Sequence, residues 1–253
     1  MKTLHHVRNE LRLKMFLARR YWLESVAAFL VIVGTFFGLL HVVSAAGGMP
    51  LHSERLDGLI LGFVLWMFAG AAYSSTSNEI AEEIRSRSLE QLCLGALPLW
   101  KILAIRAALN IAIGAFVLIL SLTVIESMGR EKLHVLEPAI FAIVLLAAPA
   151  LLGLGYMIAG VLLVMRKVEA VQLLVYPGLI GLVALPAYPL NVLSALPFAY
   201  GASAARLATL GYSLSVQDFL LTGVNSLMWL SAGITVFVLF EARARRSGVM
   251  GHA

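Results

Sequence analysis

Residues 138–165 read PAIFAIVLLAAPALLGLGYMIAGVLLVM and contain no charged side chain. An α-helix rises about 1.5 Å per residue, so about 20 apolar residues cross the hydrocarbon core of a bilayer. This stretch is long enough to do so and therefore predicts a transmembrane helix. This segment decides the fold class, because a small soluble domain does not have enough interior to bury an uncharged apolar helix of this length.

The composition of the whole chain agrees with this prediction. The chain has 253 residues, of which 60% are hydrophobic and 13% are charged, against about 25% charged in a soluble domain. Its mean hydropathy is +0.91. These values exclude a disordered chain and a disulfide-rich secreted domain, and they disfavour a soluble enzyme, whose interior could not bury this much apolar surface.

Apolar runs recur along the chain and predict six transmembrane helices in one all-α, polytopic domain that covers residues 1–253. The spans are expected at about 22–43, 57–77, 102–125, 138–165, 170–186 and 219–240. The first run competes with a signal peptide, because Ser44-Ala45-Ala46 resembles a cleavage site. Its apolar part is longer than the ~7–15 residues of a signal peptide, which favours a retained helix.

The orientation follows from the positions of the basic residues. With six spans, both termini lie on one side, and only four of the 19 Lys and Arg residues fall on the other: Arg55, Arg130, Lys132 and Arg206. Lys and Arg collect on the cytoplasmic side of membrane proteins, so both termini are predicted to be cytoplasmic. The same rule accounts for the net charge of +5 without a nucleic-acid partner.

Residues 1–20 precede the first span and have a helical pattern. Leu4, Val7, Leu11 and Met15 fall on one face, while Arg8, Arg12 and Arg19 fall on another. This pattern favours a helix that lies in the membrane interface. The alternative is a solvated basic leader that only orients the first span.

The segment between the second and third spans, residues 78–92, reads NEIAEEIRSRSLEQL. It combines charged residues with an apolar repeat. One interpretation is a solvated loop with local ion pairs, and the other is a short cytoplasmic helix that presents a surface to another protein. The candidate docking residues are Glu79, Glu82, Glu83, Arg85, Arg87, Glu90 and Gln91, of which Glu83 and Glu90 are expected to face solvent.

Two further segments are unusual for a membrane protein. Residues 187–218 mix apolar side chains with prolines, which predicts either a broken re-entrant segment on the outer side or an amphipathic loop. Gly34 and Gly38 form a Gly-x-x-x-Gly in the first span. Because this spacing allows two helices to approach closely, these glycines are candidates for a dimer seam.

No catalytic or metal-binding constellation is recognisable in the sequence. The chain has no HExxH, no Gly-x-Ser-x-Gly and no P-loop motif. Asn110 and Asn225 lie inside predicted spans, where an interhelical hydrogen bond or a polar path would explain them. No catalytic residue, metal ligand or cofactor is expected in this chain.

The order of these segments resembles the membrane subunits of ABC-2 type exporters, also called type V ABC transporters. In that family the loop after the second helix typically reads Glu-x-Glu-Arg-Gly-Thr-Leu-Glu-Gln-Leu, followed by a proline and an aromatic residue. The residues that match it are Glu83, Leu89, Glu90, Gln91, Leu92 and Trp100, and Ser88 replaces Thr. The residues that depart from it are Arg85, Ser86, Arg87 and Ala96, where Glu, Arg, Gly and Pro are usual. In the outer segment, Pro197, Phe198, Tyr200 and Arg206 are similar to a second family pattern.

The resemblance implies the permease subunit of an exporter in a prokaryotic cytoplasmic (inner) membrane. It also implies a separate ATP-binding subunit in two copies, which would bind ATP and Mg, and a second permease copy or a paralogue. The segment after the second span would be the coupling helix that docks the ATPase. The substrate is expected to be amphipathic or lipid-like. The alternatives are a membrane enzyme that acts on lipids and a non-transporting scaffold for an ATPase.

Overall fold

The computed structural model describes residues 2–47, 54–94, 97–128, 138–165 and 168–246, and these are helical with no strand. Apolar residues dominate the long segments, and a helix satisfies its own backbone hydrogen bonds, which a bilayer cannot do. The helices are α1 (Lys2–Arg20), α2 (Trp22–Gly47), α3 (Glu54–Arg85), α4 (Leu89–Cys93), α5 (Leu99–Met128), α6 (Pro138–Met165), α7 (Val168–Ala184), the 3-10 helix η2 (Val192–Ala195), α8 (Ala199–Ala208) and α9 (Val216–Arg246).

Three of the described helical segments are long and apolar enough to cross a membrane. They are Leu99–Val117 of α5, α6 and α9. This finding confirms the predicted all-α class and indicates a membrane protein. The stretch from which the fold class was predicted is α6 itself, and its observed bounds, Pro138–Met165, coincide with the predicted span.

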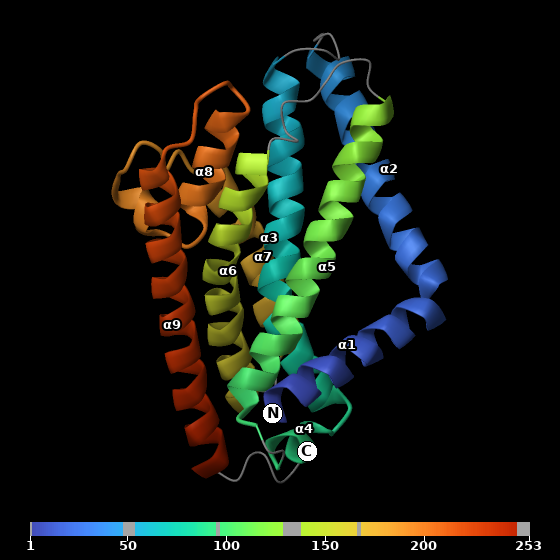
Figure 1. Ribbon diagram of the computed structural model, residues 1–253, viewed down its shortest axis with the longest axis vertical. Coiled ribbons are helices and arrows are strands. Elements are labelled where there is room, and N and C mark those ends of the chain that lie inside the picture. Colours follow the sequence, from blue (N-terminus) through green and yellow to red (C-terminus); the bar gives the residue numbers. More distant parts are fainter. Residues whose placement is uncertain (1, 48–53, 95–96, 129–137, 166–167, 247–253) are drawn as a thin grey trace.

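Helix α6 lies at the centre of the bundle, between α3 and α9 (Figure 1). Its most extensive contact is with α9, and small residues make this contact close. A Cβ placed on Gly153 would overlap the backbone of Trp229, and one on Gly233 would overlap the backbone of Gly153. The two helices therefore touch backbone to backbone, as glycine allows in membrane helices.

Two clusters of buried residues hold the described helices together. The larger cluster joins α3, α6, α7 and α8 and includes Phe68, Tyr73, Ile143 and Phe198. The smaller one lies at the end of the bundle next to α4, where Leu89 and Leu99 pack with Tyr156 and Phe237. The Tyr156 hydroxyl also donates a hydrogen bond to the Trp100 carbonyl oxygen (2.7 Å). The connection from α3 to α5 is thus packed against the bundle.

Helices α1 and α2 lie at the periphery. Helix α1 starts beside the bundle near α4 and runs obliquely outward, and α2 then returns along the side of the molecule (Figure 1). The start of α1 and the end of α9 lie at the same end of the molecule as α4, whereas η2 and α8 lie at the opposite end (Figure 1). We call these the α4 end and the α8 end.

The segment after the second predicted span differs from the prediction of one separate coupling helix. Glu79, Glu82, Glu83 and Arg85 lie on the last turns of α3, which continues without interruption to Arg85. No proline or glycine interrupts residues 71–85, so the helix propagates until Arg87 adopts a left-handed conformation (φ 57°). Only the short α4 is separate.

Candidate functional site

A largely buried guanidinium joins three helices at the α4 end. Arg106 lies on α5, and its side chain is 14% exposed. Its Nη1 lies 3.0 Å from Glu79 Oε2 and 2.7 Å from Glu83 Oε1, and both carboxylates are on α3. Its Nε lies 3.1 Å from Glu10 Oε1 on α1. Arg106 therefore contacts carboxylates on both neighbouring helices, and the planar fork of arginine suits such multiple contacts.

Two further side chains complete this group. Lys14 Nζ on α1 lies 3.2 Å from Glu79 Oε1, and Asn110 Nδ2 on α5 donates to the same oxygen at 3.3 Å. We call the six residues the Arg106 cluster; they are Glu10, Lys14, Glu79, Glu83, Arg106 and Asn110. The Asn110 side chain thus makes an interhelical hydrogen bond, one of the two explanations that its place in a span allows.

The electrostatics of the Arg106 cluster favour the charged form of Glu79. Burial alone would raise the pKa of Glu79, but the charges of Lys14 and Arg106 outweigh burial and hold this pKa below its usual value. Removing Arg106 would take the guanidinium partner from three largely buried carboxylates, Glu10, Glu79 and Glu83, which is far more costly than never having the pairs. The cluster thus fixes how α1, α3 and α5 sit relative to one another.

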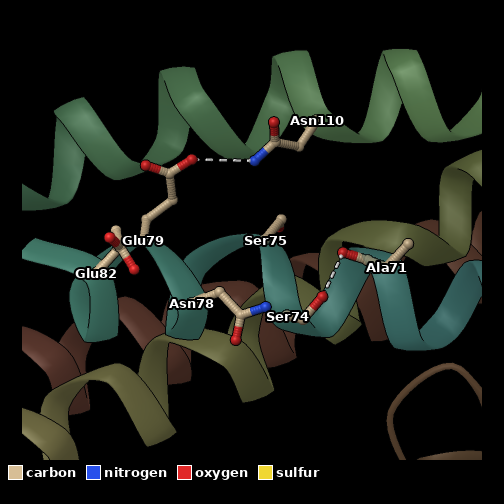
Figure 2. A pocket seen from close by; sticks show the side chains of 7 residues that line it. All are labelled: Ala71, Ser74, Ser75, Asn78, Glu79, Glu82 and Asn110. Carbon is tan, nitrogen blue, oxygen red and sulfur yellow. Dashed lines mark hydrogen bonds between the residues drawn. The ribbon is translucent and has the colours of Figure 1, made fainter. Parts of the chain in front are cut away.

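A pocket of about 450 Å³ lies next to the Arg106 cluster along α3. Every lining residue except Ala71 has a polar side chain; the others are Ser74, Ser75, Asn78, Glu79, Glu82 and Asn110. Figure 2 shows Glu79 pointing from α3 toward Asn110 on α5, with Ser74 and Asn78 on the neighbouring turns of α3. The Ser74 hydroxyl donates to the Ala71 carbonyl oxygen (3.3 Å) rather than across to α5.

The predicted docking residues divide into two groups in the structure. Glu82, Arg85, Arg87 and Gln91 are exposed, and Arg85 Nη1 lies 3.3 Å from Glu82 Oε2 in a solvent-facing pair. Such a pair contributes little to stability, so these side chains can contact a partner protein at little cost to the fold. We call these four residues the exposed connector surface.

Glu79 and Glu83 form the other group. Both were expected to belong to the docking surface, with Glu83 facing solvent, but their side chains are 19% and 15% exposed and bind Arg106. The expectation that Glu83 is solvent-facing is wrong, because the helical repeat turns Glu79 and Glu83 toward α5 and away from the side of Glu82. Glu90 lies on α4, and its side chain is outside the described residues.

The turn between α3 and α4 holds the exposed connector surface in place. The Ser88 N–H donates to the Glu83 carbonyl oxygen (3.1 Å) and the Arg87 N–H to that of Ile84 (3.3 Å), which ends α3 in a Schellman-like turn. The Ser88 hydroxyl donates to the Glu83 carboxylate. Glu83 therefore links the turn to Arg106, and the surface rests on the Arg106 cluster.

The outer residues taken from the resemblance come together at the α8 end. Pro197, Phe198 and Tyr200 are buried, and the Tyr200 hydroxyl donates to Asp218 Oδ1 (2.6 Å). Arg206 donates from Nη1 to the Ala184 carbonyl oxygen (3.2 Å) and from Nη2 to that of Leu185 (2.6 Å). Arg206 thus satisfies carbonyl groups at the end of α7, a structural role.

Asn225 has a similar role in α9. Its Nδ2 donates to the Ser194 carbonyl oxygen at 3.1 Å, and Trp229 Nε1 donates to that of Ala195 at 2.8 Å. Both contacts join α9 to η2, so Asn225 does not line a polar path in the described part of the chain. The sequence offered two explanations for Asn225, and the contact with η2 supports the hydrogen-bonding one.

Gly34 and Gly38, the candidates for a dimer seam, lie on the peripheral helix α2. A Cβ at either position would meet no atom within 4 Å. Nothing among the described residues therefore requires glycine here for packing within one chain. The dimer seam stays a prediction.

Sequence reasoning missed half of the Arg106 cluster, because it counted Arg106 with the basic loop and Glu10 and Lys14 with a leader helix. The signal was present, since a charged residue one turn inside an apolar helix needs a partner. Among the described residues, no group of three or more His, Cys, Asp or Glu side chains is arranged to hold a metal ion.

No family model matches this chain, and no curated protein or solved structure is significantly similar to it. The fold and the hydropathy define a class, that of all-helical membrane proteins with at least three spanning-length helices among the described residues. The particular function within that class is a matter for proposal.

Proposed function

We propose that this chain is the permease subunit of an ATP-driven exporter in a prokaryotic cytoplasmic membrane. In this proposal α2, α3, α5, α6, α7 and α9 are the six spans, and the α4 end is cytoplasmic. The consecutive long helices alternate in direction between the α4 end and the α8 end (Figure 1), which supports an even number of crossings. Fifteen of the 19 Lys and Arg residues fall on the α4 side of this topology, which agrees with the orientation.

The observation that carries the proposal is the position of the exposed connector surface on the Arg106 cluster. Glu82, Arg85, Arg87 and Gln91 present both signs of charge to solvent, and such a surface suits a contact that is steered and reversible. The Arg106 cluster directly beneath joins α3 to α1 and α5. A force applied to the connector would therefore act on three helices together.

The mechanism follows from this connection. The partner is a separate ATP-binding subunit in two copies, which binds ATP and Mg and closes on ATP. Its closure pushes on the exposed connector surface, and Glu83 and Arg106 pass the displacement to α5. The chain itself is not an enzyme in this proposal, and a second permease copy or a paralogue pairs with it, with Gly34 and Gly38 as candidate seam residues.

The cargo class is an amphipathic or lipid-like molecule that moves outward between the two permease copies. The polar pocket beside the Arg106 cluster supports an amphipathic cargo over a purely apolar one, because it offers hydroxyl, amide and carboxylate groups at the edge of the bundle. The exposed apolar side chains of α2, such as Leu23, Leu30 and Val31, suit a lipid-facing or partner-facing surface.

The test begins with purification of the tagged full-length chain from native membranes under mild solubilisation. We expect a P-loop ATPase to co-elute, with ATP hydrolysis that depends on this chain. The variant Glu82→Lys/Arg85→Glu/Arg87→Glu should lose the ATPase, because all three side chains are exposed and reversed in charge. The control Gln217→Lys changes the charge at an exposed position of the α8 end and should keep the ATPase.

The other outcomes discriminate between the alternatives. Elution of the folded chain without any ATPase would overturn the proposal and favour a membrane enzyme. An ATPase that co-elutes but drives no movement of fluorescent lipids or amphipathic dyes in reconstituted vesicles would favour a scaffold. Retention of the ATPase by the triple variant would show that docking occurs elsewhere.

A further inference from the structure

We propose that α1 is a binding site for anionic phospholipid headgroups, formed by Arg8, Arg12 and Arg19. We call these three residues the arginine stripe. The inference goes beyond transport, since it assigns a lipid partner to a helix that the exporter proposal uses only as an interfacial element. It stands on the position of α1 and on its charge, and it does not depend on the ATPase.

The first step concerns which face of α1 is already used. Glu10 and Lys14 are four residues apart and so lie on one face, where they contact Arg106 and Glu79 of the bundle. At about 100° per residue, Arg8, Arg12 and Arg19 group together on the opposite face. The contacts of Glu10 and Lys14 thus turn the arginine stripe away from the protein, and all three arginines are exposed.

The second step concerns charge. Glu10 is the only acidic residue in α1, and it is 6% exposed and bound to Arg106. No acidic side chain of α1 is therefore available to balance the stripe. The outward face of the helix carries positive charge only, and its complement is an anionic surface.

The third step decides between a membrane and an acidic protein. The arginine stripe is flanked by exposed apolar side chains, with Leu11 46%, Met15 54% and Phe16 60% exposed. A basic face beside large apolar side chains is typical of helices that bind in the headgroup region. A soluble acidic partner would leave these apolar groups in water.

The fourth step is the depth of the helix. Helix α1 ends at Arg20, and α2 begins at Trp22, so only Tyr21 separates them. Tyr21 and Trp22 are 43% and 58% exposed, and aromatic residues of this kind collect at the membrane–water interface. If α2 spans the membrane, α1 leaves it at the level of the headgroups. With the α4 end cytoplasmic, as in the proposed topology, the anionic lipids of the cytoplasmic leaflet are then within reach of the stripe.

The experiment uses the full-length chain in micelles that contain equal amounts of phosphatidylglycerol and phosphatidylcholine, and native mass spectrometry measures which lipids the protein retains. We expect the wild type to prefer phosphatidylglycerol. A basic residue near an anionic surface contributes about a fivefold gain in affinity. The variant Arg8→Gln/Arg12→Gln/Arg19→Gln should therefore bind phosphatidylglycerol about 100-fold more weakly at low salt, and Arg12→Gln alone about fivefold more weakly.

Matched variants separate this site from a general effect of charge. Arg85→Gln/Arg87→Gln/Lys101→Gln removes three exposed charges at the same end and should keep the preference, as should Arg8→Lys/Arg12→Lys/Arg19→Lys. An equal loss in the first of these controls, or an unchanged preference in the stripe variant, would overturn the proposal. A wild type that retains both lipids equally would also overturn it. The ATPase is absent throughout, so failure of the exporter proposal would not affect the result.

Discussion

Arg106 is the residue on which the α4 end of the molecule depends. A guanidinium inside an apolar helix needs carboxylate partners, and Arg106 takes them from both α1 and α3. Salt bridges of this kind add little net stability, but breaking one leaves a charge without a partner. The physical role of the Arg106 cluster is therefore to allow one arrangement of three helices and to exclude others.

Arg87 carries a backbone conformation that glycine would adopt at lower cost. Its φ of 57° lies in the left-handed region, at the position after α3 where glycine is usual. We expect Arg87→Gly to stabilise the chain by up to about 1 kcal/mol, since a left-handed conformation costs a side-chain-bearing residue roughly that much. Thermal unfolding of the purified chain in detergent measures the effect.

The control for Arg87→Gly is Arg85→Gly, two residues earlier in the last turn of α3. There the backbone is helical, and glycine should cost up to about 1 kcal/mol instead. Each variant replaces an arginine side chain with glycine, and the two must shift the unfolding temperature in opposite directions. Shifts of the same sign would contradict the left-handed assignment.

At the scale of helices, the contact between α6 and α9 depends on glycine at its closest points. A Cβ on Gly153 would meet the Trp229 carbonyl group, and backbone atoms cannot move aside as a side-chain tip can. We expect Gly153→Ala and Gly233→Ala each to destabilise the chain by about 1–3 kcal/mol, the range for overpacked cores. Thermal unfolding in detergent tests this expectation.

Gly114→Ala provides the comparison. Gly114 lies in α5, where a Cβ would meet no atom within 4 Å, so alanine should be neutral or stabilising by up to about 1 kcal/mol. If Gly153→Ala were as harmless as Gly114→Ala, the close contact of α6 with α9 would be refuted. The pair therefore separates helix propensity from helix packing.

The helices were more predictable than the contacts between them. Length and hydropathy were sufficient for α6, because an uncharged run of this length has one stable form in a bilayer. The continuation of α3 to Arg85 was missed, since residues 78–92 were interpreted as a solvated loop or a separate short helix, although charge alone does not break a helix. The pairing of Glu10 with Arg106 joins residues far apart in the sequence, and no local pattern in a single sequence records such a contact.

At the scale of the whole molecule, the alternating directions of the long helices predict on which side of the membrane each loop lies. The turn after α3 and the loop after α8 lie at opposite ends (Figure 1). In the proposed topology, Ser86 is therefore cytoplasmic and Ser213 faces outward, and both positions are exposed. Cys93 is the only cysteine, so replacing it with serine gives a background without thiols.

Ser86→Cys and Ser213→Cys in this background test the proposed topology directly. A maleimide that cannot cross membranes, applied to intact cells, should label Ser213→Cys, because no lipid separates that thiol from the medium. Ser86→Cys should react only after the membrane is permeabilised. Labelling of both positions in intact cells would contradict the helix arrangement. The reverse pattern would keep the arrangement but invert it, and it would remove the exposed connector surface from any cytoplasmic ATPase.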